Sequence, residues 1–459
     1  MATVFPPLNR DPDAGLVRAL GLGRAVMLVI GSVLGSGIFL TTGVMAQHIP
    51  SASLLLLAWI LGGILCIAGG LTLAELGAMY PRSGGLYVFL SEAYGPLFGF
   101  LYGWACFLVI LSGAQAAVAV GFAEYFSYFF PALATTNILV SIPLPWGVLQ
   151  ISAGQVVACL VIVAIGLINF RGVATGSFVQ SLCTFTAAAA LAILPVLTLA
   201  ASRVTPSYTP VLPEVPRVAV GFGVAMVAVM WTYEAWYYVA FASGEIKDPV
   251  RNVPRAMVLG ILALMGLYVS VNLAYLYSLS IDEMSGVVRV AERAVTALVG
   301  DRGAFVVAAT VCLSTFGCCA AGAISMSRAC YAMAVDRVFI PAAANVHPRY
   351  RTPHVAIALT TAWAVLLTLS GTYEQLFTYV TFASLLFGVA GGVSIFILRW
   401  RKPDFPRPYR AWGYPWVPLF FVLGSLLLVV NTLLESPKES GAGLVLVALG
   451  LPAYFYWRK

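Results

Sequence analysis

Charged residues are scarce in this sequence. Asp, Glu, Lys and Arg together make up 9% of its 459 residues, whereas soluble globular domains carry about 25%. Hydrophobic residues account for 61%, against roughly 45–50% in soluble domains. Such a composition cannot supply the polar surface of a soluble domain of this length, and it is too apolar for a disordered chain. The sequence therefore predicts a protein whose surface faces lipid.

Patterns typical of enzymes and metal sites are missing. Only three histidines occur, namely His48, His347 and His354, and the predicted topology keeps the first away from the other two. All eight cysteines lie inside or at the ends of apolar stretches, and none form a Cys-x-x-Cys pair. Basic residues are not interleaved with aromatics as in nucleic-acid-binding segments. We expect no metal, no cofactor, no catalytic residue and no nucleic-acid partner.

The sequence instead contains many long apolar stretches. A helix that crosses a bilayer needs about 20 mostly apolar residues, and twelve stretches meet this length without the alternation of barrel strands. The predicted spans are 22–47, 54–79, 98–123, 147–169, 176–201, 218–242, 256–280, 302–329, 354–371, 374–398, 416–434 and 441–457. We therefore expect an all-α integral membrane protein with twelve transmembrane helices.

Positive charge is distributed unevenly between the predicted loops. With a cytoplasmic N-terminus, 19 of the 25 Lys and Arg residues lie on the cytoplasmic side and six on the other side. Because cytoplasmic loops carry the excess of Lys and Arg, both termini are predicted to be cytoplasmic, with residues 1–21 as a tail. The protein should be a multi-pass protein of the cell membrane. The same asymmetry explains the net charge of +7.

The first span contains a run of small residues at its middle, Gly35-Ser36-Gly37. Each glycine weakens a helix by up to about 1 kcal/mol relative to alanine. If the helix unwinds there, the freed N–H groups and the positive dipole end of the following half-helix favour an anion, such as a carboxylate. Close packing of small residues against a neighbouring helix is the alternative interpretation.

The sixth span carries Glu234 at its middle, within Trp231-Thr232-Tyr233-Glu234. An ionisable group inside a membrane is unfavourable unless it faces protein or water, so it indicates a functional site. A protonated glutamate hydrogen-bonded within the bundle is the alternative. Glu75, near the end of the second span, is interpreted as structural. Spans 1 and 6 hold corresponding positions in a five-plus-five arrangement, and paired interruptions of this kind point to a transporter site.

Ordered segments along the chain resemble the amino acid–polyamine–organocation superfamily, and most closely its bacterial L-type amino acid transporter (LAT)-like permeases. They are Gly35-Ser36-Gly37-Ile38-Phe39, Ala74-Glu75-Leu76-Gly77 with Pro81-Arg82-Ser83-Gly84-Gly85, Gly244-Glu245-Ile246-Lys247-Asp248-Pro249, His347-Pro348-Arg349-Tyr350-Arg351-Thr352-Pro353, and Arg401-Lys402-Pro403. The resemblance covers spans 1 through 11.

This resemblance implies a leucine-transporter-type core of two inverted five-helix repeats with broken helices 1 and 6. Residues 22–201 would form the first repeat and residues 218–398 the second, and 416–457 would hold two appended helices. The backbone amides of Gly35, Ser36 and Gly37, with the Ser36 hydroxyl, would bind the α-carboxylate of an amino acid. The carbonyls of Val33, Trp231 and Glu234 would lie near its ammonium group. Trp231 would cover the substrate, and Thr232 and Tyr233 would form the unwound turn.

The sequence departs from its relatives at two points. Many relatives carry a lysine in span 5 that takes the place of a sodium ion, whereas Ala187 occupies that position here. Animal L-type carriers join a heavy chain through a cysteine in the loop between spans 3 and 4. The segment from Glu124 to Trp146 contains no cysteine, so no disulfide-linked heavy chain is expected.

The residues and the resemblance together predict a transporter rather than an enzyme. We expect sodium-independent transport of neutral L-amino acids by alternating access, as an exchanger, in contact with membrane lipid. Two alternatives stay open, both of which use Glu234. In the first, Glu234 would carry a proton in coupled transport. In the second, Glu234 would pair with the second ammonium group of a cationic amino acid. An amino acid sensor that transports nothing is a remote third possibility.

Overall fold

The computed structural model describes residues 16–144, 147–202, 204–206, 208, 215–287, 289–370 and 373–457, and it is nearly all helical. The first half contains α1 (Leu22–Val33), α2 (Gly37–His48), α3 (Ala52–Met79), α4 (Leu86–Tyr94), α5 (Pro96–Ala105), the π-helical η1 (Cys106–Ile110), α6 (Leu111–Phe126), η2 (Pro131–Leu133), β1 (Ile138–Leu144), β2 (Gly147–Ser152), α7 (Ala153–Phe170) and α8 (Val173–Ala201).

The second half is helical wherever it has regular structure in the described ranges. It contains α9 (Val215–Tyr233), η3 (Tyr238–Glu245), α10 (Pro249–Ser278), α11 (Ile281–Met284), α12 (Val290–Val299), α13 (Asp301–Val335), η4 (Pro341–Ala344), α14 (His354–Ser370), α15 (Tyr373–Arg401), α16 (Trp416–Glu435), α17 (Pro437–Ala448) and α18 (Gly450–Trp457).

Ten helical stretches of the described chain are long and apolar enough to cross a membrane, and two shorter apolar helices cover His354–Leu369 and Gly443–Trp457. Large apolar side chains lie exposed on several of them. Leu160, Phe185 and Leu199 are 65%, 66% and 88% exposed. Exposure of this kind is stable only against hydrocarbon, so the protein is a multi-pass membrane protein.

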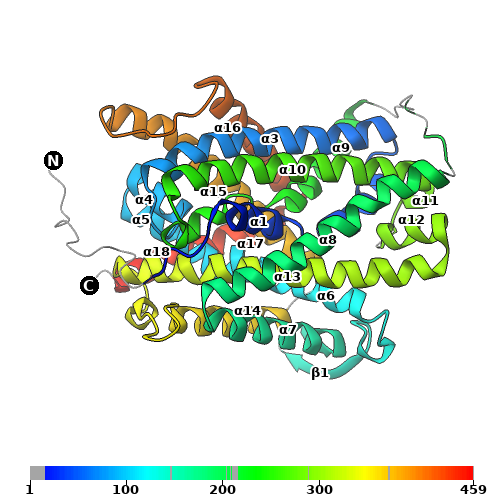
Figure 1. Cartoon of the computed structure of the whole chain (residues 1–459), viewed down its shortest axis with the longest axis horizontal. Coiled ribbons are helices and arrows are strands. Elements are labelled where there is room, and N and C mark those ends of the chain that lie inside the picture. The colour runs from blue at the N-terminus through cyan, green and yellow to red at the C-terminus, as the bar shows by residue number, and fades with distance from the viewer. Residues whose placement is uncertain are drawn as a thin grey trace.

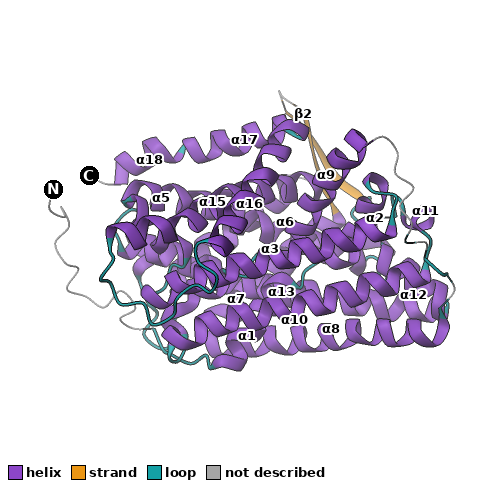
Figure 2. Cartoon of the chain, turned by 90° about the horizontal axis from the view of Figure 1, so that it is seen from above, coloured by secondary structure: helices purple, strands orange, loops and turns teal. Residues whose placement is uncertain are grey.

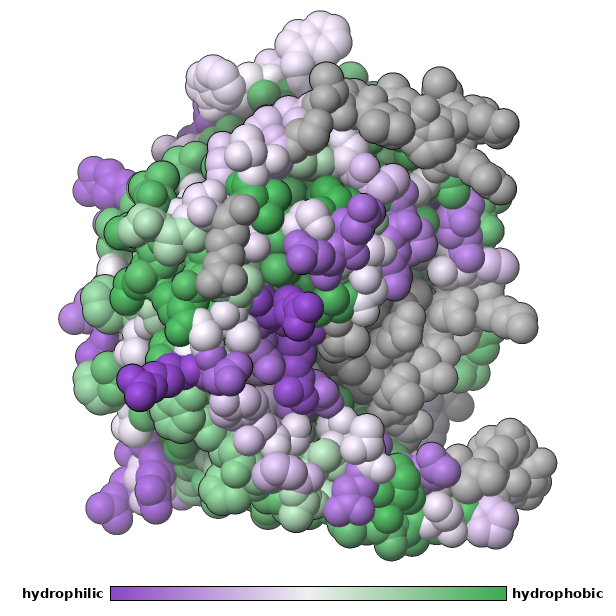
Figure 3. Space-filling model, turned by 90° about the vertical axis from the view of Figure 1, so that its right-hand side faces the viewer, coloured by the Kyte–Doolittle hydropathy of each residue, from purple (hydrophilic) through white to green (hydrophobic). Residues whose placement is uncertain are grey.

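The long helices lie side by side along the long axis of the molecule, with α3 beside α10 and α13 beside α8 (Figures 1 and 2). The central helix α1 packs against α10, α8 and α13. The described chain begins and ends at the same end of the bundle, at the left of both views, and α11 and α12 lie at the opposite end. Hydrophilic residues gather near the middle of that opposite end (Figure 3).

A β-hairpin replaces the beginning of one predicted span. The stretch 147–169 was predicted as helix throughout, but residues 147–152 form β2, which pairs antiparallel with β1 from Ile138↔Ser152 to Leu144↔Gly147. The helix α7 begins only after Ser152, whose side chain accepts from the N–H of Gln155 in a capping box. This cap sets the helix start, and a partner strand earlier in the chain takes up the apolar residues before it.

Glu75 is fully buried and is held by groups from the far end of the chain. Its carboxylate accepts from Arg399 Nη2 at 2.7 Å and Nε at 3.0 Å, and from the backbone N–H of Ala411 at 2.6 Å. The structural interpretation of this residue is confirmed, because a buried carboxylate paired in this way ties α3 to the end of α15.

Arg328 lies well inside a helix, although the predicted span 302–329 ends one residue after it. The helix α13 continues to Val335, and Arg328 and Glu245 are both 0% exposed and form a bidentate pair of 2.6 and 2.8 Å. Nearby, Leu20 and Ile246 form a parallel bridge, with Leu20 N–H donating to the Glu245 carbonyl at 2.9 Å. The segment before α1 is thereby joined to the end of η3.

Some residues used in the sequence predictions lie outside the described part of the chain. They are residues 1–15 of the predicted tail, Trp146, Arg203, Arg458 and Lys459.

The buried pair gives a stability prediction. We expect Arg328→Met to destabilise the protein by about 3–5 kcal/mol, because it leaves the Glu245 carboxylate buried without a counter-charge. Arg82→Met serves as the matched control, since Arg82 pairs with Asp336 at 3.5 Å in a partly exposed site worth about 0–1 kcal/mol. Thermal unfolding in detergent, followed by tryptophan fluorescence, measures both. Equal loss in the two variants would contradict the assignment.

Candidate functional site

The helix predicted over span 1 is broken where the glycines occur. The α1 helix ends at Val33 and α2 begins at Gly37. Between them Leu34 has φ −74° and ψ 73°, the geometry of an inverse γ-turn, and the Gly35 N–H donates to the Val33 carbonyl at 2.8 Å. The first half-helix therefore stops near the middle of the span, and a second begins after three intervening residues.

Side chains from other helices satisfy the carbonyls that the break releases. Cys318 Sγ donates to the Ser32 carbonyl at 3.2 Å, and Ser314 Oγ donates to the Leu34 carbonyl at 2.8 Å. From α10, the Tyr268 hydroxyl donates to the Val33 carbonyl at 3.1 Å. Inside a membrane such groups need protein partners, so α13 and α10 stabilise the break.

The N–H groups at the start of α2 are in a different situation. In the part of the chain that the structure describes, no backbone carbonyl accepts from the N–H of Gly37 or Ile38. These are the orphan donors of a helix N-terminus, where an anion is favoured. Of the three amides predicted to bind a carboxylate, that of Gly35 is already used in the γ-turn.

The second break follows α9 and begins later than predicted. Thr232 and Tyr233 were expected in the unwound turn, but α9 remains helical through Tyr233, and the turn covers residues 234–237 before η3 begins. Ala235 has φ 78°, a left-handed conformation that disfavours a non-glycine residue by about 1–2 kcal/mol. Strain of this kind persists where the surroundings fix it, as at functional sites.

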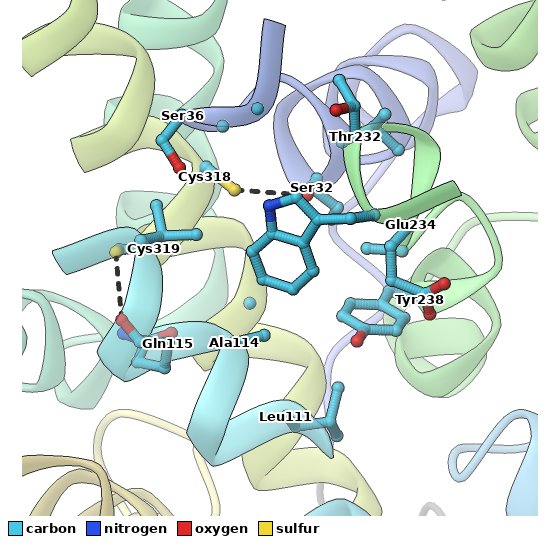
Figure 4. Close-up of a pocket in the computed structure, with 17 residues that line it drawn as sticks. Ser32, Ser36, Leu111, Ala114, Gln115, Thr232, Glu234, Tyr238, Cys318 and Cys319 are labelled. Carbon is cyan, nitrogen blue, oxygen red and sulfur yellow. Dashed lines mark hydrogen bonds between the residues drawn. The ribbon is translucent and has the colours of Figure 1, made fainter. Parts of the chain in front are cut away.

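The two breaks face one cavity of about 50 Å³, which Figure 4 shows. A single water needs about 10–15 Å³ by the same measure, so the cavity holds only a few waters. Seven of the eight predicted site residues line it, namely Val33, Gly35, Ser36, Gly37, Trp231, Thr232 and Glu234. In Figure 4, Ser36 and Cys318 lie on one side, and Glu234 and Tyr238 lie on the other.

Tyr233 is the predicted site residue that does not line the cavity. Its ring packs against Trp59 and Tyr268 at centroid distances of 5.9 and 5.1 Å, and its hydroxyl donates to the Trp59 carbonyl at 3.4 Å. The side chain points away from the break because α9 is still helical at this position. Tyr233 thus holds α9 against α3 and α10.

Sequence reasoning missed the wall formed by α6 and α13. The additional lining residues are Ser32 from α1, Leu111, Ala114, Gln115 and Val118 from α6, Cys318, Cys319 and Gly322 from α13, and Ala235 and Tyr238 near η3. Gln115 is an amide in the middle of a predicted span, a signal that was available. The small and apolar members carry no signal, because they look like any other packed residues.

Glu234 is one of the residues that line the cavity. Its Oε1 accepts from the Tyr237 hydroxyl at 2.7 Å, and its side chain is not completely buried. No cation pairs with it among the described residues, in contrast to Glu75 and Glu245. The carboxylate is therefore available to a bound molecule or to a proton.

Neutral groups connect α8 to α1 where relatives carry a lysine. Ala187 is 0% exposed. Two turns earlier, Gln180 Nε2 donates to the Met27 carbonyl of α1 at 2.7 Å and to Thr184 Oγ1 at 2.9 Å. An amide thus makes the contact between these helices. Within the described ranges, no group of three His, Cys, Asp or Glu side chains is placed to hold a metal.

Broken helices that enclose a small cavity inside a membrane bundle are typical of transporters of small solutes. The sequence profile of the amino acid permease family matches residues 20–451. The chain belongs to this family, whose members are transporters of the amino acid–polyamine–organocation superfamily, as the residues had indicated.

Similar proteins support this assignment over the full length of the chain. The serine/threonine exchanger SteT of Bacillus subtilis is 32% identical and covers 97% of this chain and 98% of its own. The human large neutral amino acids transporter small subunit 2 is 28% identical, over 98% and 84% of the two chains. The mouse Asc-type amino acid transporter 1 is 26% identical, over 97% and 82%. These relatives are amino acid transporters.

The start of α2 gives a second prediction. A Cβ at Gly37 would lie 2.6 Å from Thr232 Oγ1 and 3.0 Å from Thr232 Cα, so Gly37→Ala must push α2 away from α9. We expect a destabilisation of about 1–3 kcal/mol and a matching loss of amino acid uptake. At Gly266 in α10 a Cβ meets nothing within 4 Å, so Gly266→Ala is the control. Uptake into proteoliposomes and thermal unfolding measure both variants, and a Gly37→Ala protein as active as the control would refute the close contact.

Proposed function

We propose that this protein exchanges neutral L-amino acids across the cell membrane by alternating access, independently of sodium and without chemical conversion. The observation that carries the proposal is the cavity between two facing helix breaks, with the N-terminus of α2 on its wall. A zwitterion needs donors for its carboxylate and acceptors for its ammonium group. Amides at one break and carbonyls at the other supply both.

The substrate's α-carboxylate is proposed to bind at the start of α2, to the amides of Ser36 and Gly37 and to the Ser36 hydroxyl. Its ammonium group is proposed to bind near the carbonyls of Trp231 and Glu234. The Trp231 carbonyl accepts from the Glu234 N–H at 3.2 Å. The Val33 carbonyl already accepts from Gly35 and Tyr268, so its part in binding requires one of these bonds to open.

The proposed topology has twelve spans, both termini in the cytoplasm, and two inverted repeats over 22–201 and 218–398 followed by helices over 416–457. The ten long and two shorter apolar helices support the count. The described chain begins and ends at the same end of the bundle, as an even number of spans requires. The excess of Lys and Arg supports placing that end in the cytoplasm.

Alternating access requires each end of the cavity to close in turn. At the end that carries the chain termini, the Arg328–Glu245 pair and the Leu20–Ile246 bridge close the bundle. At the other end Arg289 pairs with Glu124 at 2.9 Å, and Thr41 Oγ1 lies 3.0 Å from Thr232 Oγ1, joining α2 to α9. A substrate moves the equilibrium only by its different affinity for the two states.

The side chains that join the helices support exchange that needs no sodium, and the loop sequence supports the absence of a disulfide-linked partner. Gln180 joins α8 to α1, and Ser314 and Cys318 join α13 to α1, by neutral hydrogen bonds. The segment from Glu124 to Trp146, where animal L-type carriers have their linking cysteine, contains no cysteine. The name of SteT refers to exchange of serine and threonine, and that of the human relative refers to large neutral amino acids, which favours neutral over cationic substrates.

Counterflow tests the proposal. We expect vesicles loaded with an unlabelled neutral amino acid to take up a labelled one faster than empty vesicles, because a slow return of the empty carrier limits net uptake. Replacing sodium by choline should leave the rate unchanged. Equal rates in loaded and empty vesicles would exclude exchange, and binding without uptake would identify a sensor.

Proton coupling is the second candidate, because Glu234 lines the cavity and pairs with no cation in the described part of the chain. Exchange of zwitterions moves no net charge, so we expect Glu234→Gln to keep the shape of the pH profile of uptake. Measuring uptake from acidic to alkaline pH in the two proteins provides the test. A pH dependence that is present in the wild type and lost in the variant would favour a proton-coupled carrier.

A further inference from the structure

Three polar atoms on the cavity wall are left without a hydrogen-bond partner in the described chain. They are Ser32 Oγ, Gln115 Oε1 and the Tyr238 hydroxyl. Their residues are 6%, 3% and 2% exposed. Buried polar groups nearly always have a partner, and an unpaired one is unfavourable. A molecule that fills this cavity is expected to supply the partners.

Gln115 projects from α6, apart from both helix breaks. Its Oε1 would lie 3.1 Å from a Cβ on Gly322, so the glycine on α13 leaves room for the amide. The backbone carbonyl of Gln115 accepts from Cys319 Sγ at 3.7 Å, which leaves the side chain uninvolved in joining the two helices. The amide offers both an acceptor and a donor to the cavity.

Tyr238 lies on the facing side, at the start of η3 (Figure 4). Its ring is held edge-on between Tyr237 and Phe241, at centroid distances of 5.1 and 5.9 Å. Ser325 Oγ donates to its backbone carbonyl at 3.2 Å. The hydroxyl is therefore placed by the packing of its own ring and backbone, although it bonds to nothing in the described chain.

The two residues do not belong to the groups that would bind the zwitterion, which leaves them to face the substrate side chain. The neighbouring wall is formed by Leu111, Ala114 and Val118, so the space is narrow and otherwise apolar. A neutral amide and a phenol satisfy a neutral group that both donates and accepts, and in so small a space a hydroxyl fits better than the larger carboxamide. An ammonium group would instead be drawn to Glu234.

We propose that Gln115 and Tyr238 form a subsite for a hydroxyl on the substrate side chain, so that the carrier selects small hydroxylated amino acids such as threonine and serine. This inference rests on the proposed function, since it assumes that a neutral amino acid occupies the cavity. Sites built to hydrogen-bond a substrate hydroxyl discriminate strongly against the analogue that lacks it, because their own polar groups are then left unpaired.

Threonine and valine test the wild-type protein, because they have nearly the same shape and differ by a hydroxyl for a methyl group. The assay is competition with uptake of labelled alanine into proteoliposomes of phosphatidylethanolamine and phosphatidylglycerol. We expect threonine to compete about tenfold or more better than valine. Equal competition by the two, or stronger competition by lysine, would overturn the subsite.

Two variants test whether Gln115 and Tyr238 cause the preference for threonine over valine. Gln115→Met and Tyr238→Phe each remove the polar atom and keep most of the volume, and each should reduce the threonine-to-valine preference by about five- to tenfold. Tyr102→Phe is the matched control, since Tyr102 is a completely buried tyrosine that does not line the cavity. It should keep the wild-type preference. An unchanged preference in both test variants would show that other residues select the side chain.

The results separate this inference from the proposed function. If alanine is taken up and threonine and valine compete equally, exchange of neutral amino acids stands and the hydroxyl subsite fails. If no neutral amino acid is taken up or competes, the proposed function fails. Because the wild-type comparison needs no variant, it decides the matter even if a substituted protein does not fold.

Discussion

A helix that breaks inside a membrane must find new partners for its backbone, because hydrocarbon offers none. The two sides of the first break solve this differently. The carbonyls of Ser32 and Leu34 are taken up by side chains of α13, which fixes the end of α1. The amides of Gly37 and Ile38 at the start of α2 have no backbone acceptor in the described chain. The carbonyl side is therefore structural, and the amide side is where a ligand can bind.

The acidic residues of the membrane region also differ in whether the protein itself supplies a partner for their charge. Glu75 and Glu245 are buried but each is held by an arginine in a bidentate pair, so their charges are compensated within the protein. Glu234 lines the cavity and accepts from the Tyr237 hydroxyl, and no cation pairs with it among the described residues. A carboxylate whose partner is neutral can still bind a cation or a proton, whereas one in a bidentate pair with arginine cannot do so without breaking that pair.

Features that depend only on residues near one another in the chain could be predicted from the sequence. Gly35 and Gly37 weaken a helix by their own conformational freedom, so the first break could be located from the sequence. The end of α9 could not, because Ala235 adopts its left-handed conformation only within the assembled bundle. The sequence also did not predict the buried ion pair of Arg328 or the place of Gln115 on the cavity wall. Both depend on other elements of the fold, on Glu245 for Arg328 and on Gly322 for Gln115.

The two ends of the cavity are closed by different kinds of contact. At the end with α11 and α12, backbones meet directly: the Gly286 N–H donates to the Gly43 carbonyl at 3.2 Å, and a Cβ at Gly221 would lie 2.4 Å from the His48 carbonyl. At the other end a desolvated arginine–carboxylate pair closes the bundle. The first end also holds the Arg289–Glu124 pair, but its charges are partly exposed and cost little to separate, whereas opening the second end must rehydrate or re-pair two buried charges. The free energy that substrate binding must supply is therefore unequal for the two directions, and it is set by the chemistry of the closures as well as by the cavity.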